Sequence, residues 1–237
     1  ICNVVSSSAA READSVLYTW AGPEIAVATT KAYSAQLAAL YLIAVRAALA
    51  RGTMAEDEAR RFCAEILALP AKIEELLGTR DEMDRLAQMY CNREDTFFLG
   101  RGVDYAAAQE ASLKLKEISY VHSEAYAGGE LKHGTISLIE EGTLVVALAT
   151  DPALYEKIVS NIQSVKARGA SVIMVTNGDY QADGTVCDHV VRLPGCPAEL
   201  AASLSIVPLQ LLAYSIGVHR GCDIDKPRNL AKSVTVE

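Results

Sequence analysis

The second half of the chain alternates between short apolar runs and longer stretches with helical periodicity. The apolar runs predict strands, at 96–100, 144–150, 171–177 and 189–193. The periodic stretches predict helices, at 104–119, 152–168 and 198–218. The strands are apolar throughout, as is typical of a parallel sheet with helices on both faces. The pattern therefore predicts an α/β fold: a complete three-layer α/β/α domain with a parallel sheet.

The first ninety residues have a different pattern. "ICNVV" at the start predicts a short buried strand, and residues 12–20 predict a second one. Alanines and leucines recur at helical intervals from 29 to 51, which predicts one long helix. Two further helices are expected, at 55–68 and 70–77, because Pro70 disfavours a continuous helix. The charged stretch 80–91 is interpreted as part of an inter-domain linker.

These patterns divide the chain into four parts. Residues 1–54 resemble the carboxyl-terminal portion of an α/β domain, and 55–92 form a helical linker. Residues 93–221 make up the complete domain, and 222–237 form a tail that has lost its periodicity after Pro227. Because the chain opens on an apolar run without Met or a charged leader, we interpret it as a fragment of a longer chain.

Composition narrows the classes of function. The chain has 237 residues, of which 51% are hydrophobic, and a net charge of −8, so nucleic acid is not an expected partner. Its six cysteines include no CxxC and no zinc-finger spacing, which indicates reduced thiols in the cytoplasm and no metal site. The longest apolar runs, 36–50 and 200–218, are interrupted by polar residues, so no membrane span is expected.

Two features of the predicted domain could bind a ligand. Gly100-Arg101-Gly102 follows the first strand at the carboxyl edge of the sheet, where open α/β folds bind ligands, although a tight turn before a helix explains it equally well. On the following helix, Glu110, Lys114 and Glu117 share an arc of roughly 60°. From spacing alone we favour a solvated face with weak ion pairs over a catalytic stripe.

Two further residues could take part in proton or amine chemistry. His133 lies in a glycine-flanked segment where an imidazole could act as general acid or base, although a lone histidine in a loop is more often merely exposed. Lys232 could be a partly desolvated, nucleophilic amine, but a terminal surface charge is the better interpretation without further information. Ser6-Ser7-Ser8 lacks the glycine spacing of a phosphate loop and is read as a simple loop.

Three segments together carry a resemblance to a known family. They are "AGPEIAVATTKAYSAQL", "EASLKLKEISYVHSEAYAGGELKHG" and the ending "DKPRNLAKSVTVE". Over essentially all its length the chain resembles the sugar-isomerising half of the glutamine–fructose-6-phosphate aminotransferases, or glucosamine-6-phosphate synthases. Their fold is of the sugar isomerase (SIS) type. Related SIS proteins share the fold and a similar helix but usually differ at the end of the chain.

The resemblance implies an amination and isomerisation of fructose 6-phosphate to glucosamine 6-phosphate, the first step of hexosamine synthesis, with no cofactor. It implies that Glu117 moves a proton between C1 and C2, that Lys114 assists it, and that Lys232 forms a Schiff base with the keto sugar. His133 would open the sugar ring of a neighbouring subunit, which implies a homodimer. The implied sugar contacts are Val27, Thr29, Arg228, Asn229 and Ala231.

One departure from the family pattern limits the expectation. The Ser-Gln-Ser-Gly-Glu-Thr-type phosphate loop is missing, and the corresponding stretch of the complete domain reads "LATDPAL". We therefore expect the phosphate loop and the glutamine-hydrolysing domain to lie upstream of Ile1, and the fragment alone to form no product. A fructosamine-phosphate deglycase, a plain sugar-phosphate isomerase and a non-catalytic phosphosugar-binding protein remain alternatives.

Overall fold

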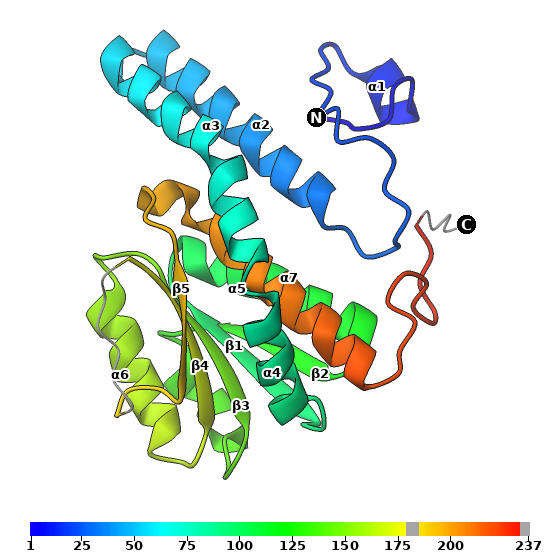
Figure 1. Ribbon diagram of the computed structural model, residues 1–237. Coiled ribbons are helices and arrows are strands. Elements are labelled where there is room, and N and C mark those ends of the chain that lie inside the picture. The colour runs from blue at the N-terminus through cyan, green and yellow to red at the C-terminus, as the bar shows by residue number, and fades with distance from the viewer. Residues whose placement is uncertain (179–184, 233–237) are drawn as a thin grey trace.

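A computed structural model describes residues 1–178 and 185–232, and it confirms the three-layer α/β/α architecture (Figure 1). The middle layer is a five-stranded parallel sheet of order β2-β1-β3-β4-β5. Its strands are β1 Asp95–Gly100, β2 His122–Ala127, β3 Leu144–Ala149, β4 Ser171–Asn177 and β5 His189–Leu193. In the parallel register, Thr96 of β1 pairs with Ser123 on one side and with Leu144 on the other.

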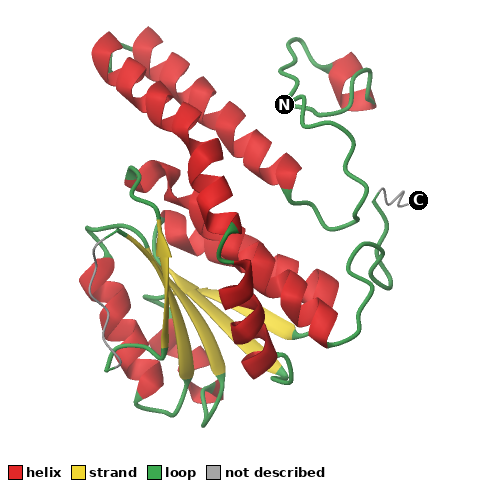
Figure 2. Cartoon of the chain, in the orientation of Figure 1, coloured by secondary structure: helices red, strands yellow, loops and turns green. Residues whose placement is uncertain are grey.

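Helices cover both faces of the sheet, as Figure 2 shows. The helices α5 (Val103–Ser119) and α7 (Ala201–His219) pack on one face, and α6 (Tyr155–Lys166) packs on the other. Successive strand residues point to opposite faces, so Phe98 belongs to the core under α5 and α7 while Phe97 belongs to the core under α6. The continuous apolar runs in the sequence are explained by these two separate cores.

Strand β2 is a feature that the sequence pattern did not predict. Its sequence, HSEAYA, is polar and carries no apolar run, because β2 lies at the edge of the sheet and pairs only with β1. Only Ser123 is fully buried among its six residues. Part of the predicted glycine-flanked loop is therefore a strand, followed by two 3₁₀ turns, η1 Leu131–His133 and η2 Thr135–Leu138.

The amino-terminal third is helical. Its helices are α1 Ser8–Glu12, α2 Lys31–Ala50, α3 Glu56–Leu77 and α4 Arg80–Tyr90. The predicted long helix at 29–51 is confirmed as α2, which runs beside α3 and joins it through a short turn (Figure 1). Tyr41 of α2 reaches α7, where its hydroxyl lies 3.1 Å from Ser203 Oγ.

The predicted break at Pro70 is wrong, because α3 continues through this residue. Proline removes one backbone donor and crowds the preceding turn, at a cost of about 3 kcal/mol in a helix interior. Leu69 before Pro70 and Leu76 after it are both buried, so the two halves of the helix pack against the same core. Tertiary packing here outweighs the local preference.

The stretch predicted as a charged linker at 80–91 is a packed helix. The inward face of α4 is formed by Met83, Leu86, Ala87 and Tyr90, all of them buried. This face packs against α7, and the charged residues between them point outward. The division of the whole chain into 1–54, 55–92, 93–221 and 222–237 stays a prediction.

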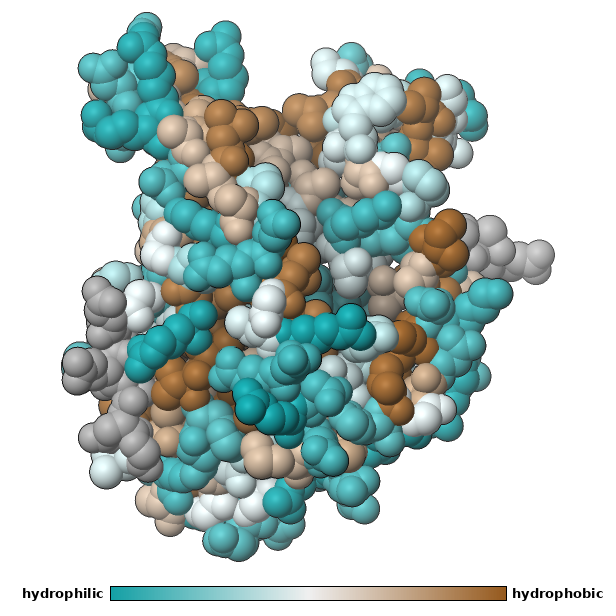
Figure 3. Space-filling view, viewed as in Figure 1, coloured by the Kyte–Doolittle hydropathy of each residue, from teal (hydrophilic) through white to brown (hydrophobic). Residues whose placement is uncertain are grey.

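The predicted buried strand at residues 1–5 is wrong. Within the described part of the chain this segment makes a single bridge, from Cys2 to Tyr18, and Val4 is 66% exposed. A strand needs a ladder of hydrogen bonds, and one bridge does not supply it. Figure 3 shows hydrophobic side chains on the surface of this amino-terminal segment, at the upper right. Further along the chain, Trp20 and Ile25 are 76% and 82% exposed.

Two helical segments, Lys31–Ala50 and Ala198–His219, are long and apolar enough to cross a membrane by length and composition. The second begins with the 3₁₀ turn η3 Ala198–Leu200 and is 78% buried, because α7 is the central helix of the core under β1–β5. A buried core helix passes the same test, so this is weak evidence for a span. All six cysteines lie in the described part of the chain, and no disulfide joins any two of them.

Candidate functional site

Glu110, Lys114 and Glu117 lie side by side on α5 and form an ion-paired cluster, the α5 stripe. The Lys114 Nζ is 2.6 Å from Glu117 Oε2 and 3.5 Å from Glu110 Oε1. The Lys114 side chain is only 5% exposed, and the two carboxylate side chains are 17% and 20% exposed. The interpretation of these residues as a solvated face is therefore wrong. The stripe faces other protein segments and borders the core.

Glu117 has one buried carboxylate oxygen that is ion-paired but accepts no hydrogen bond. Its Oε2 touches the Lys114 ammonium, but the angle of this contact is not that of a hydrogen bond. The same atom is buried and has no hydrogen-bond partner among the residues that the structure describes. A buried carboxylate oxygen without a hydrogen bond is costly unless a ligand or water completes it. Glu117 can therefore accept a proton from a bound molecule.

Burial raises the pKa of Glu110 above its usual value, although the nearby Lys114 opposes this shift. Glu110 also influences Tyr33 of α2. Burial, and to a lesser extent the negative charge of Glu110, raises the pKa of Tyr33 to about 12. Tyr33 stands in the first turn of α2, so the start of that helix lies near the α5 stripe. The candidate site is consequently bordered by α2 as well as α5.

Lys232 is held by the loop that precedes α2. Its Nζ lies 2.9 Å from both Glu24 Oε2 and the Ala26 carbonyl oxygen. Longer contacts of 3.4 Å reach the Val27 carbonyl oxygen and Thr29 Oγ1. The structure thus brings together Lys232, Val27 and Thr29, which the resemblance alone had linked. The lysine side chain is 40% exposed, so it is a clamped ammonium and not the desolvated amine considered from the sequence.

Glu24 explains why this loop has a defined shape. Its Oε1 accepts hydrogen bonds from the backbone N–H groups of Thr30, at 2.9 Å, and Ala32, at 3.5 Å, and so caps the start of α2. Burial alone would raise its pKa. The hydrogen bonds from Lys232 and from the two backbone groups outweigh burial and lower the pKa of Glu24 below its usual value. One carboxylate therefore ties the tail, the loop and the helix together.

The tail between the complete domain and Lys232 also contacts α5. The Arg228 backbone N–H donates a 2.8 Å hydrogen bond to the Tyr120 hydroxyl, and its guanidinium lies 4.1 Å from the centre of the Tyr120 ring. Tyr120 is the C-cap of α5, three residues after Glu117. The Val27 N–H donates to the Asp225 carbonyl oxygen at 2.9 Å. The tail therefore bridges the end of α5 and the loop before α2.

Asn229 and Ala231 line this tail without a described side-chain contact to the cluster. Asn229 has a left-handed backbone (φ 63°), a conformation that asparagine tolerates better than most residues, and it turns the chain between Arg228 and Ala231. Ala231 is exposed and stands next to Lys232. Residues 233–237, the end of the predicted catalytic tail, lie outside the described residues.

His133 is not part of the cluster. It ends the 3₁₀ turn η1 beyond β2, is exposed, and no hydrogen bond or ion pair joins its ring to another described residue. Gly134 next to it adopts a φ of 150°, and the space around its Cβ position is open. The histidine therefore faces outward on its own chain, and its assigned role stays a prediction.

Three residues of the site were missed by the sequence analysis: Glu24, Tyr33 and Tyr120. Glu24 stands five residues before the predicted helix at 29–51, outside the position of an N-cap, so no local capping signal points to it. Its pairing with Lys232, 208 residues away, has no signal in a single sequence. Tyr120 ends α5 with a left-handed backbone, which an isolated tyrosine does not indicate.

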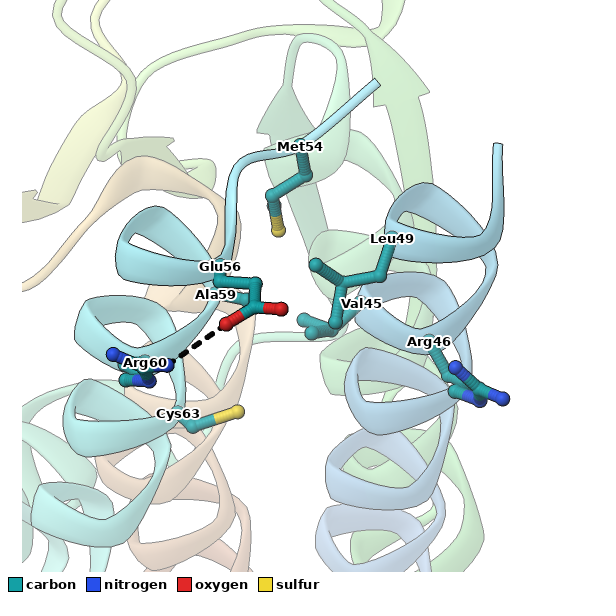
Figure 4. Close-up of a pocket in the computed structure, with 8 residues that line it drawn as sticks. All are labelled: Val45, Arg46, Leu49, Met54, Glu56, Ala59, Arg60 and Cys63. Carbon is teal, nitrogen blue, oxygen red and sulfur yellow. Dashed lines mark hydrogen bonds and ion pairs between the residues drawn. The ribbon is translucent and has the colours of Figure 1, made fainter. Parts of the chain in front are cut away.

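A crevice of about 540 Å³ lies between α2 and α3, away from the α5 stripe. Figure 4 shows Val45 and Leu49 on one side of it and Ala59 and Cys63 on the other, with Met54 at the turn. The Glu56–Arg60 ion pair at 2.8 Å stands at its rim. This crevice lies at the end of α2 opposite the Lys232 loop and contains no residue of the α5 stripe. Its size alone does not make it the candidate site.

Comparison with known proteins agrees with the observed fold. A SIS domain model matches residues 1–46 and 88–220. The glutamine–fructose-6-phosphate aminotransferase (isomerizing) of Caldanaerobacter subterraneus subsp. tengcongensis is 57% identical over 238 aligned residues. The alignment covers all of this chain and 39% of that protein, so the chain spans well under half the length of this relative.

Solved structures give the same picture. The carboxyl-terminal domain of glucosamine-fructose-6-phosphate aminotransferase from Francisella tularensis superposes with a TM-score of 0.90 at 36% identity, covering 95% of this chain and 64% of that one. Glucosamine-6-phosphate deaminase from Thermotoga maritima superposes with a TM-score of 0.70 at 26% identity, covering 97% of this chain and 64% of that one. The family model covers more than half of the residues, and the chain belongs to the SIS-domain family.

Proposed function

We propose that the chain is the isomerase portion of an enzyme that makes glucosamine 6-phosphate from fructose 6-phosphate and glutamine-derived ammonia. The name and 57% identity of the Caldanaerobacter relative support this assignment, and so does the superposition on the carboxyl-terminal domain of the Francisella aminotransferase. The observation that carries the proposal is the α5 stripe, where Glu117 is largely buried, is ion-paired with Lys114 and keeps a buried oxygen without a hydrogen bond.

Glu117 acts as the proton carrier of the isomerisation. Ammonia displaces the Lys232 amine from the Schiff base at C2 and leaves a protonated imine, from which the Glu117 carboxylate removes one C1 proton to give an enolamine. The protonated carboxyl then returns the proton to C2 while the C1 hydroxyl loses its proton to solvent, which gives the 2-amino aldose. One carboxylate is enough because the two carbons are adjacent. Lys114, 2.6 Å from Glu117 Oε2, holds the side chain in position for both transfers.

Lys232 acts as the amine that captures the open-chain keto sugar. A Schiff base needs the neutral amine, because the lone pair attacks C2 and water leaves. In the structure the Lys232 ammonium donates to Glu24, Ala26 and Val27. Lys232 must leave these acceptors before it can attack. Glu24 then still accepts the backbone hydrogen bonds at the start of α2. The clamp therefore describes the state before the sugar binds.

The remaining assigned residues complete a sugar site around Lys232. Val27, Thr29 and Ala231 surround the amine in the loop and the tail, and their backbone groups and one hydroxyl suit the hydroxyls of a hexose. Arg228 and Asn229 form the turn that brings the tail across the end of α5. The phosphate of the substrate is held by a loop outside this chain.

Two partners are part of the proposal. A second copy of the chain supplies His133 to open the sugar ring, because no described contact connects His133 to Lys232 or Glu117 of its own chain. A glutaminase domain supplies ammonia. The enzyme works in the cytoplasm, needs no metal or organic cofactor and binds neither nucleic acid nor membrane.

Trapping with borohydride tests the proposal in the complete gene product. Fructose 6-phosphate plus sodium borohydride should attach a hexitol phosphate to Lys232 and to no other lysine, as read by peptide mass spectrometry. Lys226 is the matched control, since it lies in the same tail and is exposed. Label on Lys226 at the same level, or no label on Lys232, would remove Lys232 from the mechanism.

The Thermotoga neighbour favours one second candidate, the release of ammonia from an amino sugar phosphate or fructosamine phosphate. Such a deglycase uses the same lysine and carboxylate in the opposite direction. The two functions separate on one measurement: net formation of glucosamine 6-phosphate that requires glutamine or ammonium supports synthesis. Net release of ammonia without either requirement supports the second candidate.

A further inference from the structure

A second crevice lies on the other face of the sheet, away from the α5 stripe. It has a volume of about 330 Å³, within the range of small-ligand sites. Arg101 comes to it from the end of β1, Gly129 and Lys132 from the segment after β2, and Lys157 from the first turns of α6. All three segments follow carboxyl ends of strands.

The strand order makes this the expected ligand position of an open α/β sheet. β2 pairs on one side of β1 and β3 on the other. The chain connections after β1 and after β3 therefore run in opposite directions across the sheet, which makes the position between β1 and β3 a switch point. The carboxyl ends of strands at such a switch point form the crevice in which open α/β folds bind ligands. Arg101 is the residue that follows β1 there, in the Gly100-Arg101-Gly102 turn.

Arg101 is fixed in the crevice by its neighbours. Its Nε donates a 3.2 Å hydrogen bond to Asn161 Oδ1. A Cβ at Gly128 would lie 2.6 Å from that same oxygen, so only glycine lets the backbone pass over the pair. A Cβ at Gly129 would lie 3.6 and 3.8 Å from the two terminal nitrogens of the guanidinium. The terminal N–H groups of Arg101 have no partner among the described residues, and their planar fork matches an oxyanion.

The charge of the crevice is unbalanced. Three cations, Arg101, Lys132 and Lys157, line it with a single carboxylate, Glu156, which leaves a net charge of +2. None of the three cations makes an ion pair within residues 1–178 and 185–232. A phosphate monoester carries a charge of about −1.5 to −2 at neutral pH and three strong acceptor oxygens. The Ser160 hydroxyl adds a neutral donor on the same side as Lys157.

We propose that this crevice is a phosphate-monoester binding site, distinct from the site around Glu117 and Lys232. Arg101 binds two phosphate oxygens, and Lys132 and Lys157 neutralise the charge from either side. The site does not depend on the proposed function, because none of its lining residues belongs to the α5 stripe or contacts Lys232.

Titration of the protein with inorganic phosphate, followed by ¹⁵N-NMR, tests the proposal. Phosphate should bind saturably and shift the amide signals of Gly128, Gly129 and Ser160, whereas signals of the loop 24–29 should not move. The variant Arg101→Gln should weaken binding about tenfold or more, since it removes charge-assisted hydrogen bonds. Arg85→Gln on α4 is the matched control, because Arg85 is exposed and has no described partner.

Lys132→Gln keeps the test decisive if Arg101→Gln disturbs folding, because Lys132 is exposed and holds no other segment. It should weaken phosphate binding severalfold with an unchanged melting temperature. Equal affinity of the protein, Lys132→Gln and Arg85→Gln overturns the proposal, as do shifts confined to residues 24–29. Glucose 6-phosphate and adenosine 5′-monophosphate are then titrated. Tighter binding of one of them than of phosphate identifies the sugar or the nucleoside as the source of the monoester.

Discussion

The α5 stripe and the Lys232 clamp both pair a lysine with glutamate, yet they are built in different ways. Lys114 is 5% exposed and its partners stand one turn away on the same helix. Lys232 is 40% exposed and its partners lie more than 200 residues away, in an irregular loop. The stripe keeps its geometry as long as α5 is packed, whereas the clamp exists only while the tail is docked.

This difference matches the two tasks proposed for the residues. A proton carrier has to hold its position to within a fraction of an ångström while the substrate reacts, and a packed helix provides that rigidity. An amine that attacks a ketone has to be released from its acceptors and to follow the sugar, and an exposed tail allows this movement. The molecule therefore joins a rigid acid–base residue to a movable nucleophile.

Replacing Lys114 with Met should have the largest effect on stability, because it leaves Glu110 and Glu117 half-buried and without their shared cation. We expect a loss of about 3 kcal/mol in the free energy of unfolding, the lower end of what removing one partner of a buried ion pair costs. Urea denaturation monitored by circular dichroism measures it. Lys116→Met on the same helix is the control, since Lys116 is exposed and should change stability by less than about 0.5 kcal/mol.

Equal shifts of the urea midpoint in Lys114→Met and Lys116→Met would contradict the distinction between the stripe and the clamp. In that case Lys114 would behave as a surface residue, and the rigidity ascribed to the stripe would have no energetic basis.

Replacing Glu24 with Gln should loosen the tail without unfolding the domain. The variant removes the charged partner of Lys232, a partly exposed pair worth about 1 kcal/mol. Trypsin should therefore cleave after Arg228 and Lys232 about fivefold faster, as measured by mass spectrometry of early digests. Glu12→Gln in α1 is the control, because Glu12 is exposed and has no described partner. Cleavage at an unchanged rate would show that Glu24 does not hold the tail.

Acidification should release the clamp in the same way, with the smallest effect. The pKa of Glu24 is lower in the docked state than its ordinary value of 4.5, so docking is fully stabilised above that pH. The stabilisation disappears as the pH falls through the lowered pKa. The NMR signal of the Val27 amide, which donates to Asp225, should titrate with a midpoint below 4.5. No such step should occur in Glu24→Gln, and a midpoint above 4.5 would contradict the assigned shift.

Much of the fold was readable from the sequence because its signals are local. Strands β1, β3 and β4 are buried on both faces and appear as apolar runs, the edge strand β5 keeps enough apolar residues to be recognised, and the long helices carry their periodicity. Strand β2 was missed because its polar sequence, HSEAYA, contains no apolar run. Pro70 and the stretch 80–91 were misread because packing against α7 decides their structure, and a local pattern does not reveal a distant partner.

The candidate site was only partly predictable for the same reason. The spacing of Glu110, Lys114 and Glu117 placed them on one face of α5, but spacing could not tell a solvated face from a buried one. The contact between Lys232 and Glu24 depends on how the tail folds back over the molecule, and no periodicity reports it. His133 was singled out by its glycine-flanked setting, and its role stays a prediction.

The measurement that tests the central claim most directly is synthesis of glucosamine 6-phosphate by the Glu117→Gln variant of the complete gene product. The amide keeps the size of the side chain and cannot accept the C1 proton, so product formation should fall by about a thousandfold or more, within the range for loss of a general base. Glutamine hydrolysis should stay measurable, and Glu75→Gln on the exposed side of α3 should leave both activities unchanged. Synthesis by Glu117→Gln at the rate of the Glu75→Gln control would contradict the role of Glu117 as the proton carrier.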